Sequence, residues 1–201
     1  ARMARSMQIH GFNITSPYKE EVLPFLDDAD GAARGTGAVN TVVLRNGRLT
    51  GYNTDIQGAR EALLQHGVTI RGKKALVLGA GGAARSAVFA LVSEGASVTV
   101  VNRTIERAQS IAGTFSCRAA PVDAIPREMD GTDILISCIS ESRSIVPRDC
   151  LTKDLVVLDA HYREETPLTR DAKAGKCTVI DGREWLLFQG AGAFRHFTGQ
   201  E

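Results

Sequence analysis

The sequence predicts an α/β protein that combines a doubly wound parallel sheet with a second, smaller mixed α/β part. A strand, a glycine-rich turn, a helix and another strand follow one another within about 30 residues, between Lys74 and Val101. Strands and helices then alternate as far as Ile180. Before residue 57 the pattern differs, because two short strand-like runs flank the pair Asn46-Gly47, a strong signal for a hairpin turn.

Composition narrows the class of protein. The chain has 201 residues, of which 43% are hydrophobic, so it can bury a sizeable core. Lys and Arg number 24 and Asp and Glu 23, and this balance argues against a nucleic-acid or membrane-surface binder. The sequence also suggests neither a membrane span nor a signal peptide. Four widely spaced cysteines without a partner His predict reduced thiols, a cytoplasmic location and no metal site.

The first quarter of the chain is expected to form its own mixed sheet. The strands expected there are Gly11–Thr15, Ala38–Leu44 and Arg48–Tyr52. Residues Glu20–Asp27 are expected to be helical, and Ile56–His66 to form a helix that links the two parts of the molecule.

Three polar side chains lie just past strand-like runs in this first quarter: Lys19, Asn40 and Asp55. A lysine, an amide and a carboxylate brought together in a cleft can bind a polyhydroxylated ring and transfer a proton. Each residue also has an ordinary interpretation. Lys19 can be a surface lysine, Asn40 a turn former, and Asp55 the N-cap of the linking helix, alone or in addition to a catalytic role.

The glycine-rich turn Gly79-Ala80-Gly81-Gly82-Ala83 follows the apolar run Lys74–Leu78 and opens a helix over Ala83–Ser93. We expect Gly79 to allow the tight turn, Gly81 to admit a pyrophosphate close to the backbone, and the small residues Gly82 and Ala83 to leave helix N–H groups free for the anion. This arrangement predicts a dinucleotide site, although a glycine turn can also serve packing alone.

The end of the next strand, Ser97–Val101, indicates which dinucleotide binds. An NAD-binding protein usually has Asp or Glu there, whereas this chain has Asn102-Arg103-Thr104, followed by Arg107. Guanidinium groups and a hydroxyl suit the 2′-phosphate of NADP. A solvated helix start is the alternative, but arginine in a first turn opposes the helix dipole, so a bound anion accounts for it better.

The rest of the chain continues the alternation. The expected elements are a helix over Ile105–Ala112, a loop with a short helix over Pro121–Met129, strands Asp133–Cys138 and Leu155–Asp159, a helix over Thr166–Gly175, a strand Cys177–Ile180 and a terminal helix over Gly182–Phe197. Gly190 and Gly192 disfavour that last helix, which predicts close packing against a neighbour.

Taken together, these motifs resemble those of shikimate dehydrogenase. The matching segments are N-I-T-x-P-x-K from Asn13, G-A-V-N-T from Gly37, G-Y-N-T-D from Gly51, G-A-G-G-A from Gly79, N-R-T from Asn102 and Q-G-A from Gln189. The resemblance implies an enzyme that reversibly reduces 3-dehydroshikimate to shikimate with NADPH, in the pathway to aromatic amino acids. It implies that Lys19 and Asp55 are the catalytic pair and that Thr15, Asn40 and Gln189 bind the substrate. It places the NADP site at the glycine turn and at Asn102, Arg103 and Thr104.

Three differences from the family pattern affect the substrate and nicotinamide sides. Family members begin with a further strand, helix and strand whose Ser-x-Ser motif holds the substrate carboxylate, and we expect this chain to lack that side of the pocket. After the third parallel strand the usual Gly and Met are replaced, leaving Ser140 as the hydroxyl expected at the nicotinamide. After the fourth, Tyr162 is kept but the following Asn-Pro is not, and His161 is expected to be an ordinary loop residue.

These differences keep two other functions open: a dehydrogenase of quinate or another cyclic polyol, and a noncatalytic ligand-sensing domain. We expect residues 1–57, completed by the helix at 183–201, to form the substrate domain and residues 58–182 to form the NADP domain. A homodimer and a place in a longer polypeptide are both possible.

Overall fold

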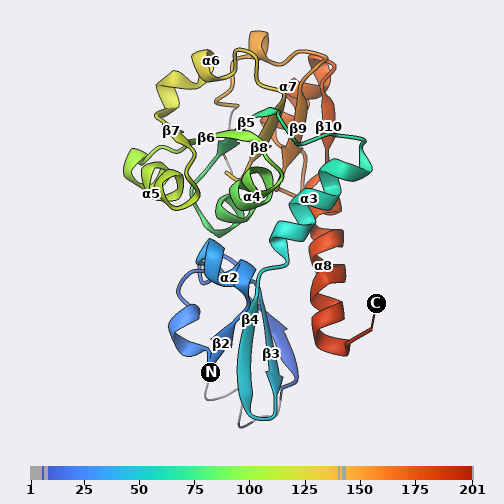
Figure 1. Cartoon of the computed structure of the whole chain (residues 1–201). Helices are drawn as coiled ribbons and strands as arrows, with labels where there is room; N and C mark the ends of the chain where they lie inside the picture. Colours follow the sequence, from blue (N-terminus) through green and yellow to red (C-terminus); the bar gives the residue numbers. More distant parts are fainter. Residues whose placement is uncertain (1–5, 7–8, 140, 142–143, 201) are drawn as a thin grey trace.

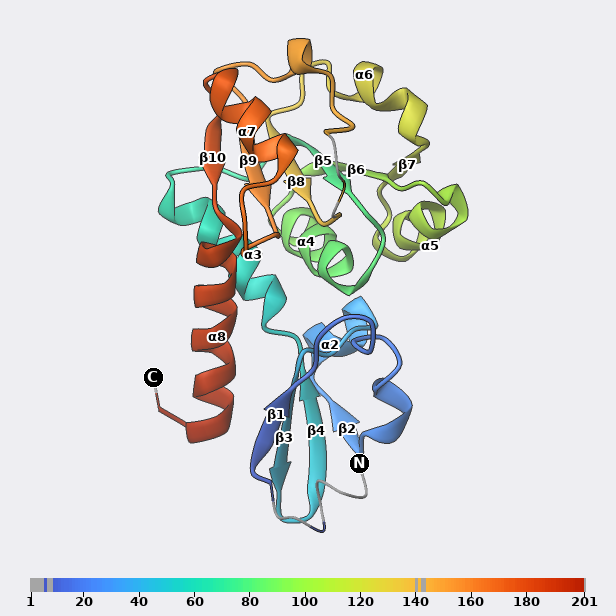
Figure 2. The same ribbon diagram turned by 180° about the vertical axis from the view of Figure 1, so that it is seen from behind.

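The computed structural model describes residue 6, residues 9–139, residue 141 and residues 144–200. It contains a six-stranded parallel sheet with helices on both faces and a separate four-stranded mixed sheet (Figures 1 and 2). The α/β class with a doubly wound parallel sheet and a smaller mixed part is therefore confirmed.

The small sheet has the order β1-β3-β4-β2. Its strands are β1 (Gly11–Asn13), β2 (Asp28–Ala29), β3 (Thr41–Arg45) and β4 (Arg48–Tyr52). β3 and β4 form the predicted antiparallel hairpin, and both turn residues, Asn46 and Gly47, have positive φ, as a tight two-residue turn requires.

The large sheet has the order β10-β9-β8-β5-β6-β7, with all neighbours parallel. Its strands are β5 (Lys74–Leu78), β6 (Ser97–Val101), β7 (Arg118–Ala120), β8 (Ile134–Ser137), β9 (Val156–Asp159) and β10 (Thr178–Ile180). The chain starts at β5 in the middle and adds strands first on one side and then on the other. The crevice between the carboxyl ends of β5 and β8 is therefore the topological switch point, where such sheets bind ligands.

Helices cover the large sheet on both faces. They are α3 (Asp55–Gln65), α4 (Gly82–Ser93), α5 (Ile105–Phe115), α6 (Ile125–Glu128), α7 (Pro167–Ala174) and α8 (Gly182–Thr198), with short 3₁₀ turns η2 (Val122–Ala124) and η3 (Arg148–Cys150). Along β5, Ala75 and Val77 belong to one apolar core, with α3, α4 and α5, and Leu76 and Leu78 to the other, with α6 and α7. Burial on both faces explains why this strand is a continuous apolar run.

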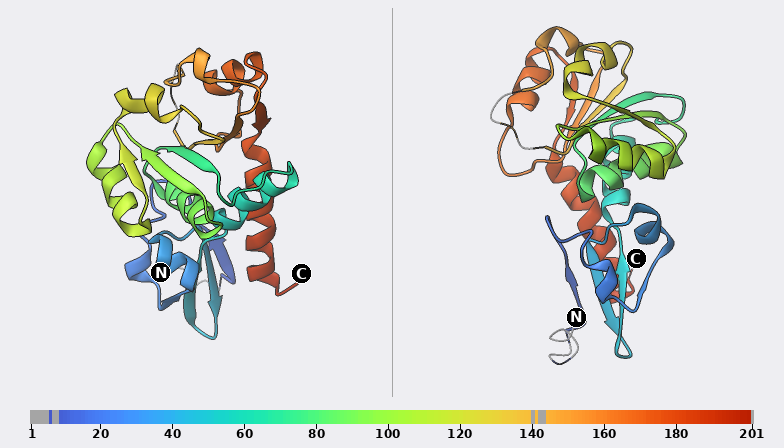
Figure 3. Two further views of the ribbon diagram at one scale, coloured as in Figure 1. Left: turned by 45° about the horizontal axis from the view of Figure 1, so that its top comes forward. Right: turned by 90° about the vertical axis from the view of Figure 1, so that its left-hand side faces the viewer.

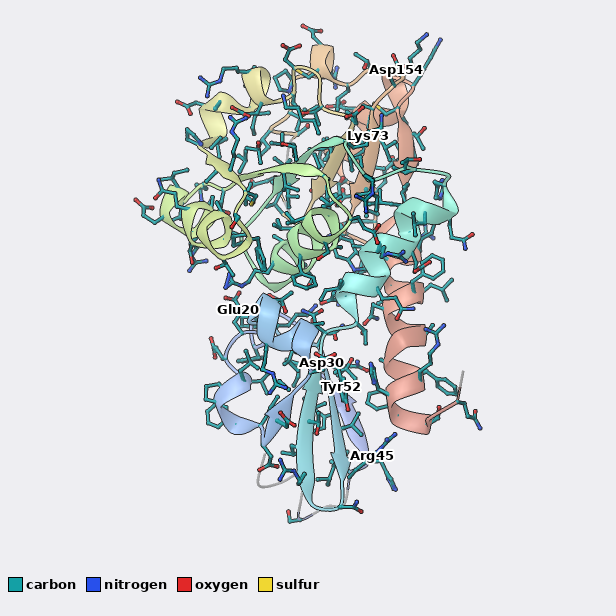
Figure 4. All side chains as sticks on the ribbon, viewed as in Figure 1. Glu20, Asp30, Arg45, Tyr52, Lys73 and Asp154 are labelled. Atoms are coloured by element: carbon teal, nitrogen blue, oxygen red, sulfur yellow. The ribbon has the colours of Figure 1, made fainter. Side chains whose placement is uncertain are left out.

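Helix α8 packs alongside α3 and extends from the large sheet to the small one (Figure 3). Near its end Phe197 packs on Gly11 of β1, and His196 stacks on Tyr52 of β4 with ring centroids 3.9 Å apart. Arg45 donates from Nη2 to the backbone oxygen of His196 at 2.9 Å, and Figure 4 shows Arg45 and Tyr52 on the hairpin beside this helix end. The last helix thus spans both parts of the molecule.

In the first quarter of the chain the observed elements differ most from those predicted from the sequence. The helix predicted over Glu20–Asp27 is wrong: the chain forms turns and a short 3₁₀ helix, η1 (Leu23–Phe25). Pro24 accounts for this, since proline removes a backbone donor and disfavours the α conformation of the preceding residue. The structure also contains α2 (Gly31–Thr36), β2 and β7, which were not predicted.

Candidate active site

A pocket of about 360 Å³ lies where the small sheet, the first turn of α4 and helix α8 meet. It is lined by Asn13, Ile14, Thr15, Lys19, Asn40, Asp55, Ala83, Ala160, Tyr162, Gly182, Trp185, Leu186 and Gln189. The five residues predicted to contact the substrate or transfer the proton all lie in this wall, although they come from four separate segments of the chain.

Lys19 and Asp55 form an ion pair. The Lys19 Nζ lies 2.5 Å from Oδ2 of Asp55, and the two side chains are only 16% and 8% exposed. An ion pair so well shielded from water is held more tightly than an exposed one. Because the pair lines the pocket, an ammonium and a carboxylate are presented together to a bound molecule.

The position of Asp55 departs from one of the sequence interpretations. Thr54 occupies the N-cap position of α3, and Asp55 is the first residue of the helix. The interpretation of Asp55 as the N-cap is therefore wrong, and its carboxylate binds Lys19 instead. The negative charge is still favourable in the first turn of α3. The backbone N–H of Asp55 donates to Oδ1 of Asn53 at 3.1 Å, which fixes the start of the helix.

Asn40 lies at the centre of a buried hydrogen-bond network. Asn40 is only 2% exposed. Oδ1 accepts from the backbone N–H of Thr54 at 2.8 Å and from the hydroxyl of Thr41 at 3.1 Å. Nδ2 donates to Oγ1 of Thr54 at 3.0 Å and to Oε1 of Gln189 at 3.1 Å. A turn-forming role alone does not account for these bonds, which join three segments at the pocket floor.

Gln189 reaches this network because α8 approaches α3 closely. A Cβ built on Gly58 of α3 would lie 2.5 Å from Cδ1 and 2.8 Å from the backbone oxygen of Trp185. A Cβ on Gly192 would lie 2.8 Å from Oε1 of Gln57 and 3.1 Å from Cβ of Thr54. The prediction of close packing is thus confirmed at Gly192. At Gly190 it is wrong, since the described structure has open space around that residue.

The remaining wall of the pocket combines polar and apolar groups. Thr15 lies in the exposed loop after β1, while Trp185 is 4% exposed and contributes an apolar surface from α8. Tyr162, predicted to border the nicotinamide, lies in the loop after β9 and is 44% exposed. Ser140, the other residue predicted there, lies outside the described residues.

Several polar residues that organise the pocket had no role in the sequence analysis. Asn13 donates from Nδ2 to the backbone oxygen of Asn40 at 3.2 Å and to the hydroxyl of Thr41 at 3.1 Å. Asn53 and Thr54 belong to the motif that ends at Asp55, yet their bonding partners lie elsewhere in the chain. Their presence in the motif is a signal, but a single sequence does not reveal which groups they bind.

The glycine turn lies beside this pocket and borders a second one, of about 450 Å³, that also includes Arg107. Gly79 has a φ of +112°, in the region that favours glycine, and packs against the backbone of Cys138 after β8. The first intrahelical bond of α4 runs from the N–H of Arg85 to the oxygen of Gly81, at 3.0 Å. The N–H groups between them have no partner within the helix, as an anion site at a helix N-terminus requires.

The positive groups after β6 are exposed. Arg103, Thr104 and Arg107 are all in the exposed class, and Asn102 donates from Nδ2 to the backbone oxygen of Thr104 at 2.9 Å. That bond shapes the turn that carries Arg103 beside the start of α5. Arg103, Thr104 and Arg107 therefore follow the carboxyl end of β6, the strand end at which dinucleotide-binding folds contact the adenosine ribose.

Catalysis by a cysteine thiol or by a bound metal ion has less support in the described residues. Burial raises the pKa of the Cys138 thiol well above its usual range, so this thiol is protonated at neutral pH. Within the described ranges, no group of three or more His, Cys, Asp or Glu side chains is placed to bind a metal ion. The described helices include none with the length and apolar character needed to cross a membrane.

Comparison with known proteins agrees with this geometry. Residues 61–159 match the family Shikimate / quinate 5-dehydrogenase, and residues 1–42 match the Shikimate dehydrogenase substrate binding domain. Shikimate dehydrogenase (NADP(+)) of Haloarcula marismortui is 42% identical over 98% of this chain and 76% of its own length.

Two solved structures are also similar. Shikimate 5-dehydrogenase of Thermus thermophilus, in complex with NADP(H) and shikimate, has a TM-score of 0.88 and 38% identity over 98% of this chain and 76% of its own. Quinate dehydrogenase of Corynebacterium glutamicum, in complex with NAD, has a TM-score of 0.91 and 31% identity over 100% of this chain and 76% of its own. The present chain thus spans about three quarters of the length of these relatives. It belongs to the shikimate dehydrogenase family.

Proposed function

We propose that this protein is an NADP-dependent shikimate dehydrogenase, which reversibly reduces 3-dehydroshikimate to shikimate in aromatic amino acid biosynthesis. The observation that carries the proposal is the Lys19–Asp55 ion pair, which lines the same pocket as Asn40 and Gln189 and lies beside the glycine turn of the large sheet. The family membership and the NADP dependence of the curated relatives support the same conclusion.

The residues around the glycine turn fit NADP. The space around Gly81 and the first N–H groups of α4, which have no partner within the helix, suit a pyrophosphate. Arg103, Thr104 and Arg107 suit a 2′-phosphate, which an acidic residue at this strand end would repel. When bound, NADPH supplies a hydride to the substrate carbonyl carbon. We propose that Gly79, Ala80, Gly81, Gly82, Ala83 and Asn102 complete the cofactor site and that Tyr162 borders its nicotinamide end.

We propose that Lys19 handles the proton of the reaction. In the reducing direction, its ammonium donates a proton to the oxygen that becomes the new hydroxyl; in the oxidising direction, the amine accepts that proton. Asp55 holds the lysine Nζ in place and accepts a hydrogen bond from a substrate hydroxyl. Thr15, Asn40 and Gln189 bind other ring hydroxyls, which orients the ring relative to Lys19.

The same assignment divides the chain by function. We propose that residues 1–57, together with the helix over 183–201, form the substrate domain, and that residues 58–182 form the NADP domain. The contacts of Gly11 with Phe197 and of Tyr52 with His196 support the grouping of the last helix with the small sheet.

The proposal is tested by following NADP⁺ reduction with shikimate in the full-length protein and in its Lys19→Ala variant. We expect Lys19→Ala to lower kcat by about 100-fold or more while leaving NADP⁺ affinity within about twofold, since general acid–base groups contribute effects of this size. Lys173→Ala is a matched control, because Lys173 lies on α7, pairs with Glu165 in the preceding loop and lies outside the pocket. A full-length protein that binds NADP⁺ but does not turn over shikimate would contradict the enzymatic function.

Quinate is a second candidate substrate for the same assay. The matched family includes quinate dehydrogenases, and one of the similar structures is a quinate dehydrogenase. We expect a higher kcat/KM with shikimate and NADP⁺ than with quinate and NAD⁺, because the exposed arginines after β6 favour the phosphorylated cofactor. The reverse order would support the quinate dehydrogenase alternative.

A further inference from the structure

Gly82 is crowded by the side chain of Lys19. A Cβ built on Gly82 would lie 3.1 Å from Cβ and 3.2 Å from Cδ of Lys19. In the dinucleotide fingerprint, the positions that require small residues are the first, third and sixth, which here are Gly79, Gly81 and Ala84. Gly82 is outside that set. Contact with the lysine stem therefore gives this glycine a second role in addition to its proposed place in the cofactor site, where an alanine would keep the same backbone N–H.

Ser86 lies one helical turn after Gly82, on the same face of α4. It is fully buried, and its hydroxyl donates to the backbone oxygen of Gly82 at 2.9 Å. Asn53 donates from Nδ2 to Oγ of Ser86 at 3.0 Å, and Oδ1 of Asn53 accepts from the backbone N–H of Asp55 at 3.1 Å. A continuous path of hydrogen bonds thus joins α4 to the residue that pairs with Lys19.

Between these two positions the same helix is also anchored to helix α2. Arg85 donates from Nε to the backbone oxygen of Thr36, the last residue of α2, at 2.9 Å. Lys19 is anchored in turn, because its backbone oxygen accepts from the N–H of Val39 at 2.8 Å. With its backbone held and its Nζ bound to Asp55, the Lys19 stem has little room to move away from an added methyl group at Gly82.

We propose that Gly82 and Ser86 are positioning residues for the Lys19–Asp55 pair: Gly82 supports the lysine stem and Ser86 supports the Asp55 end through Asn53. The first turn and a half of α4 then holds both partners of the pair as well as the anion site at its N-terminus. This inference rests on the proposed roles of Lys19 and Asp55.

The test compares Gly82→Ala and Ser86→Ala with the full-length parent in shikimate oxidation. We expect Gly82→Ala to lower kcat by about fivefold or more, since small displacements of a catalytic group have large effects on rate. We expect the KM for shikimate and the Kd for NADP⁺ to stay within about twofold of the parent. Ser86→Ala leaves Asn53 bonded to Thr36 and Ala38, so it keeps the fold and is expected to lower kcat by about threefold.

Two further variants separate positioning from other effects. Gly113→Ala, on α5 with open space around it, is the matched glycine control and should keep the parental kcat. Gly82→Ala is also combined with Lys19→Ala. If Gly82 acts through the lysine, the double variant should have the same kcat as Lys19→Ala alone, because the two changes then remove one shared contribution.

The possible results distinguish this inference from the function on which it rests. A parental kcat in both Gly82→Ala and Ser86→Ala would overturn the inference, as would a loss confined to NADP⁺ affinity or a further loss of kcat in the double variant. Should Gly82→Ala fail to fold, the kcat of Ser86→Ala decides. If Lys19→Ala itself turned over at the parental rate, the assignment of Lys19 would fall and this inference with it.

Discussion

The side-chain amide of Asn40 donates a hydrogen bond of 3.1 Å to Oε1 of Gln189, across 149 positions of the sequence. It joins the loop before β3 of the small sheet to the last helix of the chain. Because both side chains line the pocket beside Lys19 and Asp55, this bond determines the shape of the site on the side facing α8.

Gln189→Ala should therefore weaken substrate binding more than cofactor binding. The change removes one acceptor of the Asn40 amide and the proposed contact with a substrate hydroxyl. We expect the KM for shikimate to rise about tenfold, which corresponds to one or two lost hydrogen bonds, with the Kd for NADP⁺ unchanged. Steady-state kinetics and cofactor titration measure the two quantities. Gln65→Ala, at the exposed end of α3, is the control, and an equal rise in both constants would contradict the assignment.

Arg103→Asp should discriminate between the two dinucleotides. An aspartate at this strand end repels a 2′-phosphate but accepts hydrogen bonds from a free 2′-hydroxyl. We expect the Kd for NADP⁺ to rise about 10- to 100-fold and the Kd for NAD⁺ to change by less than threefold. Fluorescence titration with each reduced cofactor provides the measurement. Arg48→Asp, on the hairpin of the small sheet, keeps both affinities, and an equal loss for the two cofactors after Arg103→Asp would refute the phosphate contact.

Two helical glycines should respond in opposite ways to the same substitution. Gly58→Ala places a methyl group 2.5 Å from the Trp185 ring and 2.8 Å from its backbone oxygen, so α3 and α8 must move apart. We expect this to reduce the free energy of unfolding by about 1–3 kcal/mol, the usual range for overpacking. Gly190→Ala has open space and gains helix propensity, so it should raise that free energy by about 0.5–1 kcal/mol. Urea denaturation measures both, and destabilisation by Gly190→Ala would show that something covers that face.

The docking of α8 should weaken in acid through His196. Burial lowers the pKa of His196 in the folded protein, and Arg45 and Arg195 lower it further, whereas Asp30 acts in the opposite direction. The folded state therefore binds this proton less readily than the unfolded state. The contribution of neutral His196 to the free energy of unfolding is therefore fully present above the unfolded pKa, about 6.5. It is lost as the pH falls through the lower folded pKa.

His196→Phe keeps an aromatic ring against Tyr52 but removes the titrating group. We expect its free energy of unfolding to fall less than that of the parent between pH 7.5 and pH 5. His10→Phe, on a residue outside this stack, is the control. Identical pH dependence of the parent and His196→Phe would exclude His196 as a source of acid sensitivity.

Much of the fold was predictable from local patterns. The hairpin at Asn46-Gly47 follows from turn chemistry, and β5 follows from an apolar run that is buried on both faces. The segment over 20–27 was not predictable in this way, because its apolar spacing suggests a helix while Pro24 prevents a regular one. Strand β7 is short and lies at the end of the large sheet, where it pairs with β6, so its formation depends on the sheet.

For the candidate site, the sequence by itself determined the family and indicated which residues are candidates for proton transfer, hydroxyl binding and the dinucleotide turn, because these depend on motifs of adjacent residues. The tertiary structure decided which groups meet. Only the packing of α8 on α3, through Gly58 and Gly192, brings Gln189 to Asn40. Only the position of α4 beside the first quarter of the chain brings Gly82 to Lys19 and Ser86 to Asn53. These contacts depend on how closely two helices approach, and that distance is set by side chains far apart in the sequence.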